Sequence, residues 1–185
     1  MTQRFAQISD PHLTSLERVS ATELFNKRAL GYLSWRRRRR FEHRAEVLDT
    51  LQQDLEKYSL DQLLMTGDLT HIGLPSEFQQ ARAWLQQLGS ATDIALVPGN
   101  HDACVRATWE QTFALWADYM AGDNTAQDRT QFPTLRKRGD IAFIGVTTGV
   151  PKPPLMATGT AGPAQLGDLA PLLAAARDQG LFRVV

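Results

Sequence analysis

Short strand-like hydrophobic runs alternate with longer stretches of helical periodicity along the chain. Alternating or continuous apolar runs predict strands at 4–8, 61–66, 94–97, 134–138, 141–146 and 181–185. Apolar residues at helical spacing predict helices over 41–57, 76–88, 108–120 and 163–179, the last with a kink at Pro171. The early alternation of strand and helix predicts an α/β fold with central β-sheets flanked by helices. The later hairpin indicates that the sheet is mixed, or that two sheets pack together.

Length and composition indicate one globular domain over residues 1–185. Of the 185 residues, 43% are hydrophobic and 22% are charged, which argues against disorder. Cys104 is the only cysteine, so an intrachain disulfide framework is excluded. The N-terminus shows no apolar signal region and no run reaches the length of a membrane span. We therefore expect a cytoplasmic protein without a transmembrane segment.

The formal net charge is zero, but the charge is unevenly distributed. Residues 1–60 carry a net +3 and residues 61–185 a net −3, and the basic excess comes from the five consecutive arginines at 36–40. We interpret this run as a solvated helix face with Glu42 and Glu46 as partners. The alternative is attraction of phosphate from nucleic acid, nucleotides or lipid headgroups. No aromatic-interleaved basic groove occurs elsewhere, so we expect no dedicated nucleic-acid binding.

Polar residues cluster directly after the first three predicted strands, at 9–12, 67–68 and 98–102. The carboxyl ends of strands are where α/β proteins form ligand sites, so three loops distant in sequence should meet at one rim. Gly67 and Gly99 allow tight backbone turns there.

The side chains of these loops suit divalent metal ions. Asp10 and His12 are two residues apart in an extended turn, Asp68 offers a carboxylate able to bridge two cations, and Asn100 offers a neutral oxygen. Carboxylate, amide oxygen and imidazole together suit Mn, Fe, Co or Zn. Each motif alone could be a turn or a helix cap, whereas the three together, each after a strand, predict a metal site.

The three blocks resemble those of the calcineurin-like metallophosphoesterase family. Asp10-Pro11-His12, Gly67-Asp68 and Gly99-Asn100-His101-Asp102 match that family's first three motifs, and the resemblance extends over essentially the whole chain. Within the family the chain is similar to bacterial cyclic-nucleotide phosphodiesterases. The resemblance implies a four-layer sandwich of mixed sheets and helices.

The resemblance also implies an activity and a ligand set. The protein would be a metal-dependent phosphoesterase that hydrolyses phosphodiesters, with a small phosphate ester or a nucleotide as substrate. Asp10 and His12 would bind one metal ion, Asp68 would bridge, and Asn100 would bind the second. A hydroxide held between the two ions would attack phosphorus. His101 would donate a proton or hydrogen bond to the substrate, and Asp102 would orient it.

One departure from the family pattern concerns the later ligands. The family has three further histidines after the third block, whereas no histidine follows His101 here. We therefore expect a C-terminally truncated phosphoesterase that lacks the last strands and binds metal poorly. The alternative is a non-catalytic fragment or interaction module on the same fold, with an arginine-rich anion-binding segment.

The remaining candidate residues have simpler interpretations. We expect His43 on a helix surface and Cys104 as a small buried thiol. For His71 we favour a loop residue with no role, and the alternative is an indirect contact or a substrate contact at the site. The connection over 13–40 is long and could be a lid. Its 26–35 segment could flank the site and bind an anionic substrate, or form a short packed helix.

Overall fold

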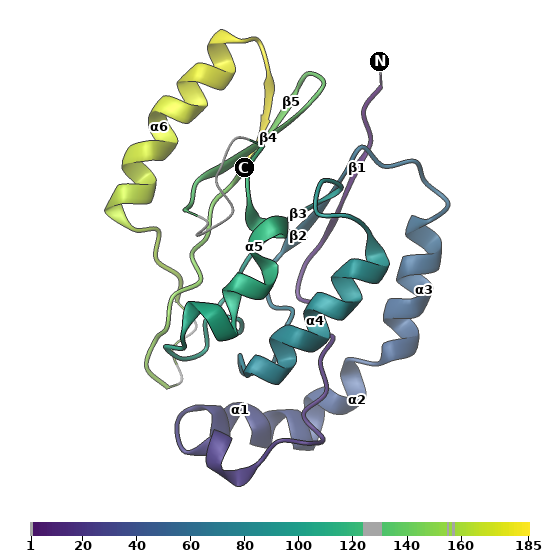
Figure 1. The fold of residues 1–185 in the computed structure, drawn as a ribbon, viewed down its shortest axis with the longest axis vertical. Helices are drawn as coiled ribbons and strands as arrows, with labels where there is room; N and C mark the ends of the chain where they lie inside the picture. Colours follow the sequence, from purple (N-terminus) through teal and green to yellow (C-terminus); the bar gives the residue numbers. More distant parts are fainter. Residues whose placement is uncertain (1, 124–130, 155, 157) are drawn as a thin grey trace.

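Two three-stranded β-sheets form the centre of the molecule (Figure 1). The fold comes from a computed structural model, which describes residues 2–123, 131–154, 156 and 158–185. The first sheet is parallel and consists of β1 (Phe5–Ile8), β2 (Gln62–Thr66) and β3 (Ile94–Val97). The second is mixed, because β4 (Thr134–Arg138) and β5 (Ile141–Gly145) are antiparallel whereas β6 (Phe182–Val184) runs parallel to β5.

Helices flank the two sheets, and the first two of them lie beyond one end of the sheets rather than on a face (Figure 1). They are α1 (Arg28–Ser34), α2 (Arg40–Glu42), α3 (Ala45–Leu55), α4 (Pro75–Leu88), α5 (Ala117–Met120) and α6 (Pro163–Asp178). A π-helical turn at Trp35–Arg39 joins α1 to α2. Helices α3, α4 and α5 accompany the parallel sheet, and α6 packs on the mixed sheet through Ala176 against Ala142. Within the described residues, no helix combines the length and apolar composition that crossing a membrane requires.

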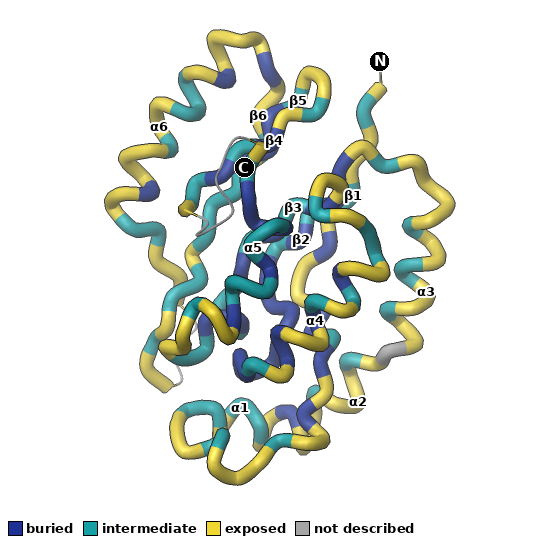
Figure 2. The backbone as a smooth tube through the Cα atoms, viewed as in Figure 1, coloured by how far each residue is buried: buried dark blue, intermediate teal, exposed yellow. Residues whose placement is uncertain are grey.

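The main core lies between the parallel sheet and α4 and α5 (Figure 2). Alternation along β2 sends Leu63 and Met65 into this core, while Leu64 and Thr66 line the space between the sheets. Phe78 of α4 packs against Trp116, with ring centroids 4.2 Å apart. These contacts explain why the apolar stripe of α4 faces the sheet.

A buried arginine joins the two sheets and α5. Arg136 of β4 is 4% exposed and donates to the carbonyls of Ala91 and Ile94 at 2.6 and 2.8 Å, and to those of Tyr119 and Ala121 at 2.7 and 2.8 Å. Burial lowers the pKa of its guanidinium to about 10. The carbonyls at the end of α5 thus obtain donors that the helix itself cannot supply.

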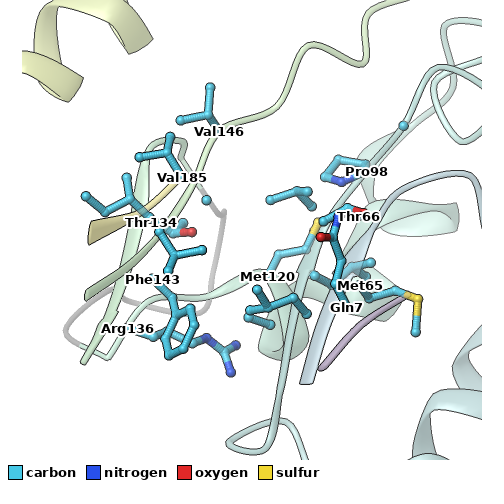
Figure 3. Close-up of a pocket in the computed structure, with 18 of the residues that line it drawn as sticks. Gln7, Met65, Thr66, Pro98, Met120, Thr134, Arg136, Phe143, Val146 and Val185 are labelled. Carbon is cyan, nitrogen blue, oxygen red and sulfur yellow. Dashed lines mark hydrogen bonds between the residues drawn. The ribbon is translucent and has the colours of Figure 1, made fainter. Parts of the chain in front are cut away.

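The space between the sheets contains a cavity of about 320 Å³ (Figure 3). Thr66 and Pro98 line it from the parallel sheet, and Phe143 and Val185 line it from the mixed sheet. Arg136 is the only charged residue among its described lining residues, and its guanidinium already donates to backbone carbonyls. The third loop borders this cavity through Pro98 and Gly99, but none of the predicted ligands Asp10, His12, Asp68 and Asn100 is among its described lining residues.

The predicted α/β class, with mixed sheets and flanking helices, is confirmed, and all six predicted strands are present. Helix α6 continues through Pro171. The predicted helix over 108–120 is wrong in form. This segment consists of 3-10 turns at Trp109–Gln111 and Phe113–Trp116, followed by the short α5. The backbone of Thr112 (φ −132°, ψ −101°) interrupts a continuous helix.

Candidate metal centre

Three loops meet at the carboxyl edge of the parallel sheet, as their positions after β1, β2 and β3 predicted. The first two loops continue the strand pairing beyond the sheet. The backbone N–H of Asp10 donates to the Gly67 carbonyl at 3.2 Å, and that of His12 donates to the Asp68 carbonyl at 3.0 Å. Parallel strands thus fix the relative position of the first two motifs.

Three of the predicted ligands have left-handed backbone conformations. Asp10, His12 and Asp68 have φ of 53°, 41° and 56°, and they are the non-glycine residues with positive φ in the described part of the chain. Such conformations cost on the order of 1–3 kcal/mol each and cluster at functional sites. The backbone is therefore strained where the candidate ligands lie.

The second and third loops pack directly against each other through glycines. A Cβ at position 67, whose φ is 88°, would lie 2.8 Å from the Gly99 Cα, and a Cβ at position 99 would collide with the carboxylate oxygen Oδ1 of Asp68. Glycine at position 99 therefore leaves room for the Asp68 side chain.

Asp102 holds these two loops together. Its carboxylate, 3% exposed, accepts hydrogen bonds from the backbone N–H groups of Asp68 (2.8 Å), Thr70 (2.9 Å) and Gly99 (3.0 Å), and from the Thr70 hydroxyl (2.9 Å). Burial raises the pKa of this carboxyl to about 7, against the hydrogen bonds from Gly99 and Thr70, which lower it. Both oxygens are thus occupied by loop donors. The sequence predicted that Asp102 would orient the His101 ring. The ring instead donates a hydrogen bond from Nδ1–H to the His71 carbonyl, at 2.6 Å.

His12, Asp68 and His101 come together in a cluster that could hold a metal ion. One ligand atom from each lies within 4.8 Å of the others. His12 Nδ1–H donates to the Thr70 carbonyl at 2.9 Å, which leaves Nε2 to bind a metal. Asp68 Oδ1 accepts the backbone N–H of His101 at 2.8 Å. Orientation of an imidazole by a backbone carbonyl is typical of metal-binding histidines, so these donors fit a divalent ion.

The other two predicted ligands lie beside this cluster. Burial raises the pKa of Asp68, and the adjacent carboxylate of Asp10 raises it further. Two neighbouring carboxylates repel each other unless a proton or a cation lies between them. Asn100 is half-buried in the turn after β3, and its side chain forms no hydrogen bond with the described residues. Both side chains remain candidates for a larger ligand set.

All four histidines of the chain gather at this edge, which corrects the expectation that His43 lies on a helix surface. His43 is half-buried, with its ring centroid 4.7 Å from that of His12, and is not a surface residue. His71 is 2% exposed and stacks on His12 at 5.2 Å with an interplanar angle of 7°. Burial lowers the pKa of His12 to about 4 and that of His71 to about 3. These rings are therefore neutral at physiological pH, the state in which imidazole binds metals.

The arginine run contributes one residue to the site. Arg39 is half-buried, and its Nη1 donates toward His101 Nε2 at 3.2 Å. Arg36, Arg37, Arg38 and Arg40 are exposed, and Arg38 pairs with Glu42 at 2.7 Å. The expected solvated helix face is thus confirmed for four arginines and wrong for Arg39.

A second buried carboxylate positions the His71 loop. Glu77 in the first turn of α4 is fully buried and accepts the Thr14 hydroxyl and the His71 N–H at 2.6 Å each. It also accepts the N–H groups of Ile72 and Leu74, at 3.1 and 3.0 Å. Four donors satisfy the buried charge and fix the loop after β2 to the loop after β1. A glutamate near a helix start was visible in the sequence, but its long-range partners were not.

Comparison with protein families gives one result. The family profile described as calcineurin-like phosphoesterase matches residues 3–160, a range that includes all three ligand loops, Arg39 and His43. Comparison with curated proteins gives no match.

Proposed function

The chain belongs to the calcineurin-like phosphoesterase family, and from that premise we propose that it is a metal-dependent hydrolase of phosphodiesters. The observation that carries the proposal is the cluster of His12, Asp68 and His101, one residue from each of the three loops. The small phosphate esters and nucleotides expected from the sequence are the proposed substrates.

Divalent metal ions would be held by the donors at this edge. His12, Asp10 and Asp68 would hold one ion, and Asn100 with Asp68 would hold a second. The mixture of carboxylate, imidazole and amide oxygen suits Mn, Fe, Co or Zn. When bound, such ions activate water as a nucleophile and neutralise charge on the phosphoryl oxygens.

His101 is placed to act on the leaving group. Its Nδ1–H is engaged with the His71 carbonyl, so Nε2 is the ring nitrogen left for a metal ion or the substrate, and we assign it to the substrate. In hydrolysis a water oxygen bonds to phosphorus, the ester P–O bond breaks and the water releases a proton to solvent. Nε2 accepts a hydrogen bond from Arg39 Nη1 in the free chain; when that bond is released, Nε2 can carry a proton and give it to the departing oxygen. Asp102 acts as a positioning residue, because it fixes the backbone of Asp68 and Gly99 rather than touching the substrate.

The test compares the cleavage of bis(p-nitrophenyl) phosphate and of p-nitrophenyl phosphate with Mn²⁺ added. The wild-type chain should cleave the diester faster than the monoester. Asp68→Ala and Asn100→Ala should reduce cleavage by at least tenfold, whereas Asp178→Asn, at an exposed site on α6, should not. Activity that survives both of the first two changes would remove the proposed centre.

A second candidate function rests on the outer face of the α1–α2 region. Leu30, Leu33 and Phe41 are 49%, 41% and 63% exposed, next to the exposed Arg36 and to Arg40, whose guanidinium lies over the Phe41 ring. Exposed apolar and basic side chains on one helix face suit the surface of an anionic bilayer. Vesicles containing phosphatidylserine should co-sediment with the chain at low salt, and the double change Arg36→Gln with Arg40→Gln should weaken this. Equal binding to neutral vesicles, or no binding at all, would contradict it.

A further inference from the structure

The segment formed by α1, the π-helical turn, α2 and His43 (residues 28–43), here called the cap helix, is docked on the loop after β2 by one face. Arg28 Nε and Nη2 donate to the carbonyls of Ile72 and Gly73 at 3.1 and 2.5 Å. At Gly31 a Cβ would collide with Cγ2 of Ile72, so the helix backbone lies directly on that side chain. Trp35, 7% exposed, packs into the same small core as Ile72. Positions 28, 31 and 35 therefore define the inner face.

The next positions on this inner face are Arg39 and His43, at successive spacings of four residues. The His43 N–H donates to the Arg39 carbonyl at 2.9 Å, which continues the helical turn to position 43. Arg39 consequently reaches His101, and His43 reaches His12. Docking of this face therefore places Arg39, and not the four exposed arginines, against the candidate metal-binding loops.

Arg39 forms no ion pair with an acidic side chain among the described residues, whereas its neighbour Arg38 pairs with Glu42. The guanidinium of Arg39 instead contacts the two ring nitrogens of His101, at 3.2 and 3.4 Å. A half-buried guanidinium whose side-chain contacts are imidazole nitrogens is incompletely compensated, and a bound anion would supply the missing charge-assisted hydrogen bonds.

We propose that Arg39 binds a non-bridging phosphoryl oxygen of the substrate, an inference that rests on the function proposed above. Nη1 lies next to His101 Nε2, the atom that faces the leaving group, so an oxygen of the same phosphoryl group can reach both. The cap helix thereby forms one wall of the site, beside the loop after β2 on which it is docked. The ligand class is a phosphate ester anion, because a guanidinium discriminates in favour of charged oxygens over neutral ones.

Arg39→Gln and Arg37→Gln make a matched pair for the test. Both remove one positive charge from the same helix, and only the first removes the inner-face guanidinium. Each chain is assayed for kcat and KM with bis(p-nitrophenyl) phosphate and Mn²⁺, and for binding of inorganic phosphate by calorimetry without metal. Thermal unfolding confirms that each variant folds. Arg39→Lys is included because it keeps the charge but loses the planar fork.

Arg39→Gln should weaken phosphate binding and lower kcat/KM by about 10- to 100-fold, the loss of one or two charge-assisted hydrogen bonds. Arg37→Gln should change both by less than about twofold, and Arg39→Lys should fall between. If the wild type cleaves the diester and Arg39→Gln matches Arg37→Gln in both measurements, the inference is wrong while the proposed function stands. If the wild type binds phosphate through Arg39 but cleaves nothing, the anion site stands and the proposed function is wrong. Neither binding nor cleavage by the wild type would overturn both.

Discussion

Replacing Asp102 by asparagine tests whether this residue holds the loops together. The asparagine oxygen can accept two of the four hydrogen bonds. The best two are those from the N–H groups of Asp68 and Gly99, which both donate to Oδ2 in the wild type. Its NH₂ group then faces Thr70, whose hydroxyl can rotate to accept but whose buried N–H loses its acceptor. One buried unsatisfied N–H and the weakened charge-assisted bonds cost about 2–4 kcal/mol. That is a large fraction of the ~5–15 kcal/mol by which domains are usually stable.

The assay is urea unfolding at pH 8, followed by tryptophan fluorescence. At this pH the wild-type carboxyl, with a pKa of about 7, is largely ionised. Asp178→Asn, which alters an exposed pair with Arg177, is the control and should shift the free energy of unfolding by less than about 0.5 kcal/mol. An Asp102→Asn variant as stable as the control would refute the reasoning. If such a variant had also lost turnover, the orientation of His101 expected from the sequence would be the better account.

Three further predictions follow from the site and the core. Gly99→Ala should abolish metal binding measured by calorimetry, because its Cβ collides with the Asp68 carboxylate, whereas Gly167→Ala in α6 meets nothing within 4 Å and should leave it unchanged. His71 should stay neutral in an NMR titration of the metal-free chain down to about pH 4, since its pKa is about 3. In the unfolded chain His71 takes up its proton near pH 6.5. Protonation of His71 therefore lowers the free energy of unfolding as the pH falls below 6.5. Titration of His71 near pH 6.5 in the native chain would contradict its burial. Arg136→Met should lower that free energy by about 3–5 kcal/mol in urea, because several buried carbonyls lose their donor, and a loss under 1 kcal/mol would show that they find other partners.

The strands and the meeting of the loops could be predicted from the sequence because both follow from local pattern. A continuous apolar run from Leu63 to Met65 marks β2, and parallel strands place their carboxyl ends at one edge, so the meeting of Asp10, His12 and Asp68 could be predicted without tertiary information. The helix over 108–120 failed because its apolar spacing is helical while the backbone at Thr112 is not. Packing of Trp116 on Phe78 determines the path of that segment.

The contribution of the cap helix could not be predicted, for a physical reason. Nothing in the run of five arginines distinguishes Arg39 from its neighbours. The orientation of Arg39 depends on how Gly31 and Trp35 pack against Ile72. His43 is placed by the same docking. The spacing of four from Trp35 to Arg39 and again to His43 was the available signal, but it became informative only once the inner face was known.

The most direct test of the central claim is the initial rate of bis(p-nitrophenyl) phosphate hydrolysis as Mn²⁺ is titrated into the chelator-treated wild-type chain, with Asp68→Asn measured alongside. The account predicts a rate that rises to saturation with Mn²⁺, returns to background on renewed chelation, and is at least about 100-fold lower in Asp68→Asn, which removes a ligand of the proposed centre. A wild-type rate that is independent of Mn²⁺, or an equal rate in Asp68→Asn, would contradict it.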